Sequence, residues 1–234
     1  MDLLQRYEHS YVPYSHQPEL ALVRGQEGEY FPGIRIENIS YPLSITAAQN
    51  ALFCCISEGK KPDRLLTTNP EDPFLPLWKK EFNISVEKLD TENPPDIVLA
   101  EIILHDHDTP DQLLINLLER ARVPNSNFPV AALAETNQGY IGGANIECTS
   151  WNMGLCAERV AIAKALTYDL NIKALHIHSR DGDYSSPCGA CRQVIIEHIP
   201  EKKIYLHHSD HTRSNHFAKD LLPFSFHSNA LSNL

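Results

Sequence analysis

The chain of 234 residues is acidic: 30 Asp and Glu residues against 20 Lys and Arg residues give a formal net charge of -10 at pH 7. This charge argues against a protein that follows a nucleic-acid backbone, because such binding depends on clustered basic residues. The 42% of hydrophobic residues is enough for one large core or two smaller ones. We therefore expect a small, weakly charged ligand and no nucleic-acid partner.

The sequence contains no run of eighteen apolar residues and no basic, apolar leader at its start. We therefore expect neither export nor membrane association. The six cysteines are too few and too unevenly spaced for a small secreted disulfide scaffold, and a CxxC pair is typical of metal-binding or redox proteins in a reducing compartment. The expected location is the cytoplasm.

The two halves of the chain are similar. A shift of 110 residues aligns residues 30–66 with 140–176 without a gap, and eight of the 37 pairs are identical, where roughly two would be expected by chance. A shift of 111 also aligns residues 12–15 with 123–126. We predict two copies of one fold, residues 1–108 and 109–234, with the boundary near residues 105–111 and Pro94-Pro95 as the alternative.

Both halves have the same predicted order of elements. A short amphipathic helix (residues 2–9 and 111–122) precedes a Pro-Ser turn and two strands that end at Glu37 and Glu147, and helices follow at 46–57 and 156–168. The second half continues with a strand at 174–178, a helix at 188–197 and a strand at 204–207. Strands that alternate with helices predict an α/β fold with a parallel or mixed sheet.

Three cysteines and one carboxylate in the second half suit a catalytic zinc ion. Cys156 and Cys188 are expected to open two helices, whose amino-terminal dipoles favour thiolates, and Cys191 follows Cys188 by nearly one turn. A structural zinc site has four protein ligands, whereas three leave a position open for water. Glu158 would face that open position and move protons.

The alternative reading is a redox CxxC pair with an unrelated buried Cys156, but such a pair needs no Cys-Ala-Glu sequence upstream. Three thiolates would leave the zinc site negative. Arg159 and Arg192 follow the ligands closely and are candidates to donate to the sulfurs, and solvated arginines are the alternative. The histidine-rich segments 105–108 and 207–211 are interpreted as polar loops at strand ends.

The residues described so far resemble the zinc-dependent cytidine deaminases, specifically the free-nucleoside enzymes with three cysteine ligands. Four stretches carry the resemblance: 145–147, 156–159, 186–193 and 221–226. A degenerate version covers the first half, as in tandem forms of the family with a noncatalytic copy. The resemblance implies two tandem three-layer α/β/α domains, each with a mixed sheet of about five strands.

The resemblance also implies an activity, which is the hydrolytic deamination of cytidine and deoxycytidine to uridine and deoxyuridine, with release of ammonia, in pyrimidine salvage. One zinc ion per chain, in the C-terminal copy, would activate water for attack on C4 of the ring, and Glu158 would move the protons. By this resemblance, Asn145 and Glu147 would bind the ribose 3′-hydroxyl, and Phe128 would pack on the pyrimidine ring. Ala157 is a further substrate-binding position, and Phe226 would reach toward a neighbouring subunit's site.

The first copy has Thr46, Ala47 and Ala48 at the positions of Cys156, Ala157 and Glu158. It therefore lacks the predicted zinc ligands and the catalytic carboxylate. Sites in this family lie at subunit junctions, so the resemblance implies a homodimer of tandem chains that mimics a four-domain assembly.

Departures from the family pattern lie beside the predicted pocket, at Asn125, Cys148 and Trp151. They leave two alternatives open. One is a deaminase of another cytosine-containing nucleoside or nucleoside antibiotic, and the other is a zinc-bound pseudoenzyme that binds nucleosides without turning them over.

Overall fold

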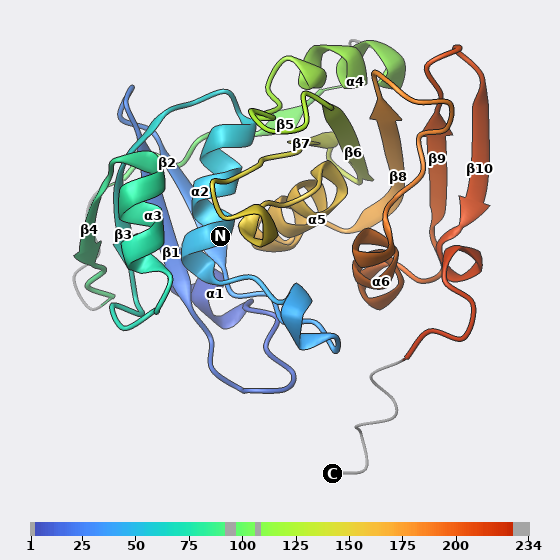
Figure 1. Ribbon diagram of the computed structural model, residues 1–234. Coiled ribbons are helices and arrows are strands. Elements are labelled where there is room, and N and C mark those ends of the chain that lie inside the picture. Colours follow the sequence, from blue (N-terminus) through green and yellow to red (C-terminus); the bar gives the residue numbers. More distant parts are fainter. Residues whose placement is uncertain (1–2, 92–96, 106–108, 227–234) are drawn as a thin grey trace.

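The computed structural model describes residues 3–91, 97–105 and 109–226. Two mixed β-sheets flank a central pair of helices (Figure 1). This is the α/β class with two similar sheet-and-helix units that the sequence predicts. Residues 106–108 of the predicted boundary region 105–111, and the alternative Pro94-Pro95, lie outside the described residues. The exact division stays a prediction.

The first sheet has the strand order β2-β1-β3-β4, and only the β3–β4 pair is parallel. Its strands are β1 (Leu20–Gly25), β2 (Tyr30–Ile34), β3 (Pro62–Thr67) and β4 (Ser85–Lys88). The accompanying helices are α1 (Leu3–Glu8), the 3-10 turn η1 (Tyr41–Leu43), α2 (Ala47–Ser57) and α3 (Leu75–Phe82).

The second sheet has the order β10-β9-β8-β6-β7-β5, and only β8 and β9 run parallel. Its strands are β5 (Ile103–Leu104), β6 (Val130–Thr136), β7 (Tyr140–Ala144), β8 (Ile172–Ser179), β9 (Lys203–His207) and β10 (Arg213–Phe217). The helices are α4 (Pro110–Leu118), α5 (Ala157–Thr167) and α6 (Gly189–His198), with 3-10 turns η2 (Trp151–Met153) and η3 (Ala218–Leu221).

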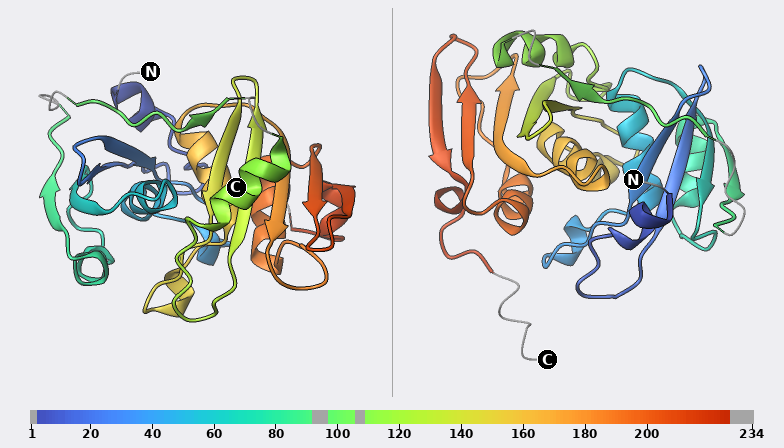
Figure 2. Two further views of the ribbon diagram at one scale, coloured as in Figure 1. Left: turned by 90° about the horizontal axis from the view of Figure 1, so that it is seen from above. Right: turned by 180° about the vertical axis from the view of Figure 1, so that it is seen from behind.

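The helices α2 and α5 lie against each other between the two sheets, and α4 covers the opposite face of the second sheet (Figures 1 and 2). Each central helix touches a glycine of its own sheet. A Cβ atom on Gly33 would lie 2.2 Å from the Ala51 nitrogen, and one on the equivalent Gly143 would lie 2.4 Å from the Ala157 oxygen. These contacts fix where α2 and α5 start on their sheets, because no larger residue fits.

One continuous hydrophobic core runs through both copies. A smaller cluster lies between α4 and β6 and consists of Leu113, Leu114, Leu117, Ala131 and Leu133. A buried polar contact also joins the copies. Lys164 on α5 is 1% exposed and donates to the Gly142 carbonyl, to Ser57 and to Glu58. Every donor of this buried ammonium is therefore satisfied, as burial of a charge requires.

Within the described ranges, no helix combines the length and the apolar composition needed to cross a membrane.

Candidate active site

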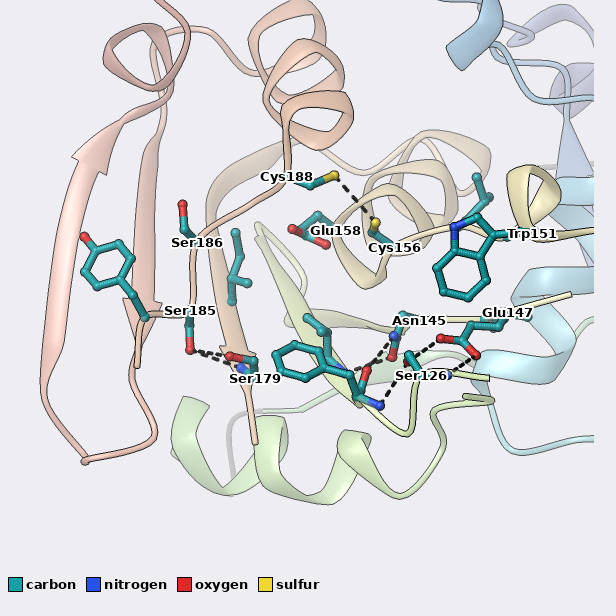
Figure 3. Close-up of a pocket in the computed structure, with 17 residues that line it drawn as sticks. Ser126, Asn145, Glu147, Trp151, Cys156, Glu158, Ser179, Ser185, Ser186 and Cys188 are labelled. Carbon is teal, nitrogen blue, oxygen red and sulfur yellow. Dashed lines mark hydrogen bonds between the residues drawn. The ribbon is translucent and has the colours of Figure 1, made fainter. Parts of the chain in front are cut away.

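Three thiols converge where α5 and α6 begin. Cys156 is the N-cap of α5 and Cys188 is the N-cap of α6, so both sulfurs face helix amino termini, as the sequence predicts. The Sγ atoms of Cys156 and Cys188 are 3.8 Å apart (Figure 3). Those of Cys188 and Cys191 are 3.5 Å apart, and all three lie within 4.8 Å of one another. Tetrahedral zinc with Zn–S bonds of about 2.3 Å places its sulfurs about 3.8 Å apart. The donor set therefore fits a zinc ion.

The local hydrogen bonds favour thiolate at Cys188. Its sulfur lies in hydrogen-bond contact with the sulfurs of Cys156 and Cys191, and it accepts from amide groups of the first turn of α6, including that of Cys191 at 3.5 Å. These bonds lower the pKa of Cys188 to about 2, against the opposing effect of burial. A deprotonated sulfur is the form that binds a metal ion.

Glu158 lies in the first turn of α5, beside the thiols and only 3% exposed. Burial, followed by the nearby Cys188, raises its pKa to about 7. Its Oε2 atom is buried and has no hydrogen-bond partner within the described part of the chain. A carboxylate that is held this way is ready to exchange a proton with a bound molecule.

A cavity of about 510 Å³ opens in front of these residues. This volume is in the range of pockets that hold small ligands. Figure 3 shows Cys156, Cys188 and Glu158 on one side of the cavity and Asn145 and Glu147 on another. The lining residues are Ser126, Phe128, Val130, Asn145, Ile146, Glu147, Trp151, Gly154, Leu155, Cys156, Glu158, Ile177, Ser179, Tyr184, Ser185, Ser186 and Cys188.

Glu147 lies just beyond the end of β7, with its carboxylate held by the turn before β6. Its Oε2 accepts hydrogen bonds from the amides of Asn125 at 2.8 Å and Ser126 at 3.2 Å, and the Ser126 hydroxyl donates to Oε1. Burial raises the pKa of Glu147, but the hydrogen bonds from Ser126 and Asn125 outweigh it, so the net pKa is below the ordinary value. This pocket wall therefore carries a fixed negative charge.

The side chain of Asn145 hydrogen-bonds the main chain at the start of β6. Its Oδ1 accepts from the Val130 amide at 2.8 Å, and its Nδ2 donates to the Phe128 carbonyl at 3.0 Å. One N–H of the amide and one lone pair of its oxygen remain for a ligand. Asn145 thus shapes the segment that carries Phe128 as well as the pocket surface.

The other predicted substrate-binding residues, Phe128, Ala157 and Phe226, lie at different places relative to the cavity. Phe128 is 39% exposed and lines the cavity. Ala157 is fully buried between Cys156 and Glu158, beneath Gly143. Phe226, the last described residue, is 57% exposed and lies outside the set of lining residues, so its predicted approach to a neighbouring subunit stays a prediction.

The hydrogen bonds of the two predicted supporting arginines go to oxygen atoms. Arg159 Nη2 donates to the Leu43 carbonyl of the first copy at 2.8 Å. Arg192 donates to the carbonyls of Pro187 at 2.9 Å and Leu221 at 3.2 Å, and to the Ser186 hydroxyl at 2.8 Å. Arg159 still interacts electrostatically with all three cysteines. Arg192 joins the loop before α6 to the C-terminal segment.

The first copy keeps the main-chain hydrogen bonds that hold the equivalent carboxylate, but it lacks the thiols. Glu37 Oε2 accepts from the amides of Tyr14 at 3.1 Å and Ser15 at 3.0 Å, as Glu147 does in the second copy. Arg35 replaces Asn145, and its guanidinium pairs with Glu37 at 3.0 Å and Glu19 at 2.8 Å. The cavity beside Glu37 measures only about 10 Å³. At the positions of Cys156 and Glu158 this copy has Thr46 and Ala48, which offer neither a thiolate nor a carboxylate.

The histidines 207 and 208 lie at the end of β9, but both are buried, at 5% and 6% exposure. His207 hydrogen-bonds Asp111 at 2.7 Å and His176 at 3.1 Å. Sequence reasoning placed them in a polar loop and missed this burial. Residues 106–108 of the other histidine-rich segment lie outside the described residues.

Sequence reasoning also missed three serines of the pocket, Ser126, Ser179 and Ser185. Ser179 and Ser185 hydrogen-bond each other at 2.9 Å beneath the loop that leads to Cys188. Only Ser126 had a signal, since it aligns with Ser15 of the first copy.

Comparison with known proteins places these features in a family. Residues 106–207 match a family model described as the cytidine and deoxycytidylate deaminase zinc-binding region. The cytidine deaminase of Halalkalibacterium halodurans is 37% identical over 115 residues, which are 48% of this chain and 87% of that protein. The cytidine deaminase of Sporosarcina psychrophila is 46% identical over 81 residues, 34% of this chain and 60% of that protein.

Among solved structures, the cytidine deaminase of Burkholderia pseudomallei is 34% identical with a TM-score of 0.47, and the match covers 51% of this chain and 100% of that one. On the strength of the sequence relatives, the chain belongs to the cytidine deaminase family of hydrolases.

Proposed function

We propose that this protein is a zinc-dependent deaminase that hydrolyses cytidine and deoxycytidine to uridine and deoxyuridine, releasing ammonia, in pyrimidine salvage. The observation that carries the proposal is the arrangement of three converging thiols with a buried, unpartnered carboxylate oxygen of Glu158 at one end of a nucleoside-sized cavity. The relatives of this chain that are named cytidine deaminases support the same reaction.

Cys156, Cys188 and Cys191 would hold one zinc ion per chain, in the C-terminal copy. When bound, zinc supplies Lewis acidity that makes water reactive near neutral pH. The first copy has Thr46 at the position of Cys156, which supports a single zinc ion.

Glu158, Phe128, Asn145 and Glu147 would carry out proton transfer and substrate binding. Glu158 Oε2 takes one proton from the attacking water and passes it to the pyrimidine N3, and it then takes the second proton of that oxygen and passes it to the departing amine. It can do so because it is buried and its oxygen is free. Phe128 packs on the pyrimidine ring at the exposed side of the cavity. Asn145 and Glu147 bind the ribose 3′-hydroxyl, and the fixed negative charge of Glu147 makes it an acceptor.

We further propose a cytoplasmic homodimer of tandem chains. Tyr41 and Trp151 occupy equivalent positions in η1 and η2, and they are 84% and 64% exposed. Large exposed aromatic side chains favour a protein partner surface. A reducing compartment suits three free thiols. Light scattering that gives a stable and fully active monomer would contradict the dimer.

The direct test is an ultraviolet assay of cytidine and deoxycytidine loss by zinc-loaded protein, with Glu158→Gln as the matched control. A panel that adds deoxycytidylate and a blasticidin-type nucleoside tests the alternative substrates. Turnover by the wild type that the variant lacks supports the proposal. Nucleoside binding without turnover of any cytosine compound would instead indicate the pseudoenzyme.

A further inference from the structure

One glutamate of each copy accepts a hydrogen bond from the main chain of the other copy. Glu81 is the next-to-last residue of α3, and its carboxylate accepts hydrogen bonds from the Thr149 amide at 3.2 Å and 3.3 Å. Glu197 is the next-to-last residue of α6, and its carboxylate accepts from the Ile39 amide at 2.9 Å and 3.2 Å. Ile39 and Thr149 are equivalent under the shift of 110 residues. The same contact is therefore made once in each direction.

The two contacts differ in what else each carboxylate binds. Glu197 accepts from the hydroxyls of Tyr14 at 2.9 Å and Tyr11 at 3.3 Å, which are neutral donors. Glu81 instead pairs with the Arg122 guanidinium at 2.9 Å, and its side chain is only 4% exposed. Burial raises the pKa of Glu81, but hydrogen bonds from Thr149 and Arg122 bring it below the ordinary value. Of these two contacts, only the one beside the candidate active site includes an ion pair.

Arg122 connects Glu81 to the pocket. Its second guanidinium nitrogen donates to the Glu147 carbonyl, and its own carbonyl accepts from the Glu147 amide at 2.8 Å. Thr149, the other partner of Glu81, follows Glu147 by two residues. Glu81 thus holds the main chain of Glu147 from both sides without touching the cavity.

A second pair of hydrogen bonds between the copies is also reciprocal. Gln49 Nε2 donates to the Met153 carbonyl at 2.8 Å, and Arg159 Nη2 donates to the Leu43 carbonyl at 2.8 Å. Gln49 is equivalent to Arg159 and Leu43 to Met153. Met153 ends η2, the turn that carries the pocket residue Trp151. The first copy therefore holds the pocket wall at a second point.

We propose that Glu81 of the N-terminal copy is a positioning residue for Glu147, and that it sets the affinity of the pocket for the sugar hydroxyl. The proposal rests on the proposed function, since it takes a ribonucleoside as the ligand. A charged carboxylate that holds Arg122 and the Thr149 amide keeps the Glu147 carboxylate at a fixed place, and a neutral replacement relaxes both contacts.

The test compares Glu81→Gln with Glu197→Gln, because the second variant removes the matching contact on the copy without a pocket. Each is assayed with cytidine and with 2′,3′-dideoxycytidine, which lacks the hydroxyl. Glu81→Gln is expected to raise KM for cytidine about tenfold, with little change in kcat and little change in KM for the dideoxynucleoside. Glu197→Gln is expected to leave both KM values near wild type, and Glu81→Asp to recover part of the loss.

Equal effects of Glu81→Gln on both nucleosides, or no effect, would overturn the proposal. A crystal structure of Glu81→Gln gives a readout that needs no activity: the Glu147 carboxylate is expected to shift or to lose order, and an unchanged carboxylate would overturn the proposal. A wild type that is inactive on every nucleoside refutes the proposed function and the sugar role of Glu81 with it. An active wild type with an insensitive Glu81→Gln refutes only the positioning role.

Discussion

The ammonium group of Lys164 donates to the carboxylate of Glu58 and thereby joins the central helix of the C-terminal copy to the residue that follows α2 in the N-terminal copy. Arg120 binds the other oxygen of Glu58 at 2.7 Å. Neither copy is therefore a separate unit in this structure, because each holds a charge that the other neutralises.

Replacement of Lys164 by alanine is expected to lower the free energy of unfolding by about 3 to 5 kcal/mol, since it breaks a buried ion pair. Urea denaturation followed by circular dichroism measures the loss. Lys60→Ala removes an exposed Lys–Glu pair with Glu27 and serves as the control, for which we expect a much smaller change. Similar losses in the two variants would show that burial gives Lys164 no special role.

Gly143→Ala is expected to displace the start of α5 and, with it, Cys156 and Glu158. The added Cβ would lie 2.4 Å from the Ala157 carbonyl oxygen and 2.6 Å from the Ala161 nitrogen, and both of these are main-chain atoms that cannot rotate away. Zinc content measured by mass spectrometry should fall, together with thermal stability. Gly189→Ala is the matched control, because its Cβ would meet nothing within 4 Å although Gly189 adjoins Cys188. Equal zinc binding by the two variants would contradict the steric account.

The stability of the protein should fall in acid partly through Glu81. The folded state depresses the pKa of Glu81 below its ordinary value of 4.5. A depressed pKa stabilises the fold fully above the unfolded pKa, and this contribution disappears as the pH falls through the folded pKa. Between pH 6 and pH 3, the free energy of unfolding of Glu81→Gln is therefore expected to fall less steeply than that of the wild type. Parallel curves would show that Glu81 contributes nothing to the pH dependence.

Glu158→Gln is expected to keep its zinc and to lose activity by a factor of at least about 100, because a neutral amide cannot carry protons between water and the ring. Its thermal stability should equal or exceed that of the wild type, since the change removes a buried carboxyl group with an unpartnered oxygen. Turnover close to the wild-type rate would remove Glu158 from the mechanism.

The sequence predicted the part of the fold around the three thiols well because its signals are local. Cys156 and Cys188 stand directly before helical stretches, and the observed helices begin one residue after each of them. The helix α3 was missed because residues 70–76 contain three prolines. Pro76 lies in the first turn of α3, where a missing amide hydrogen costs nothing. The strand β10 was missed because its residues are mostly polar and exposed.

The partners of Arg159 and Glu81 were beyond sequence reasoning for another reason. Arg159 was expected to bind the neighbouring sulfurs, yet its hydrogen bond goes to Leu43, 116 residues away in the other copy. Glu81 reaches Thr149 over 68 residues. Contacts between the copies depend on how α2 packs against α5, and no local pattern in the sequence specifies that packing.

We propose that the C-terminal copy holds a single catalytic zinc ion and that the N-terminal copy holds none. It is tested most directly by measuring zinc per chain and cytidine turnover on the same purified sample, before and after removal of the metal by a chelator. We expect one zinc ion per chain, and turnover that is lost with the metal and restored by zinc. Two zinc ions per chain, or full activity of the zinc-free protein, would contradict it.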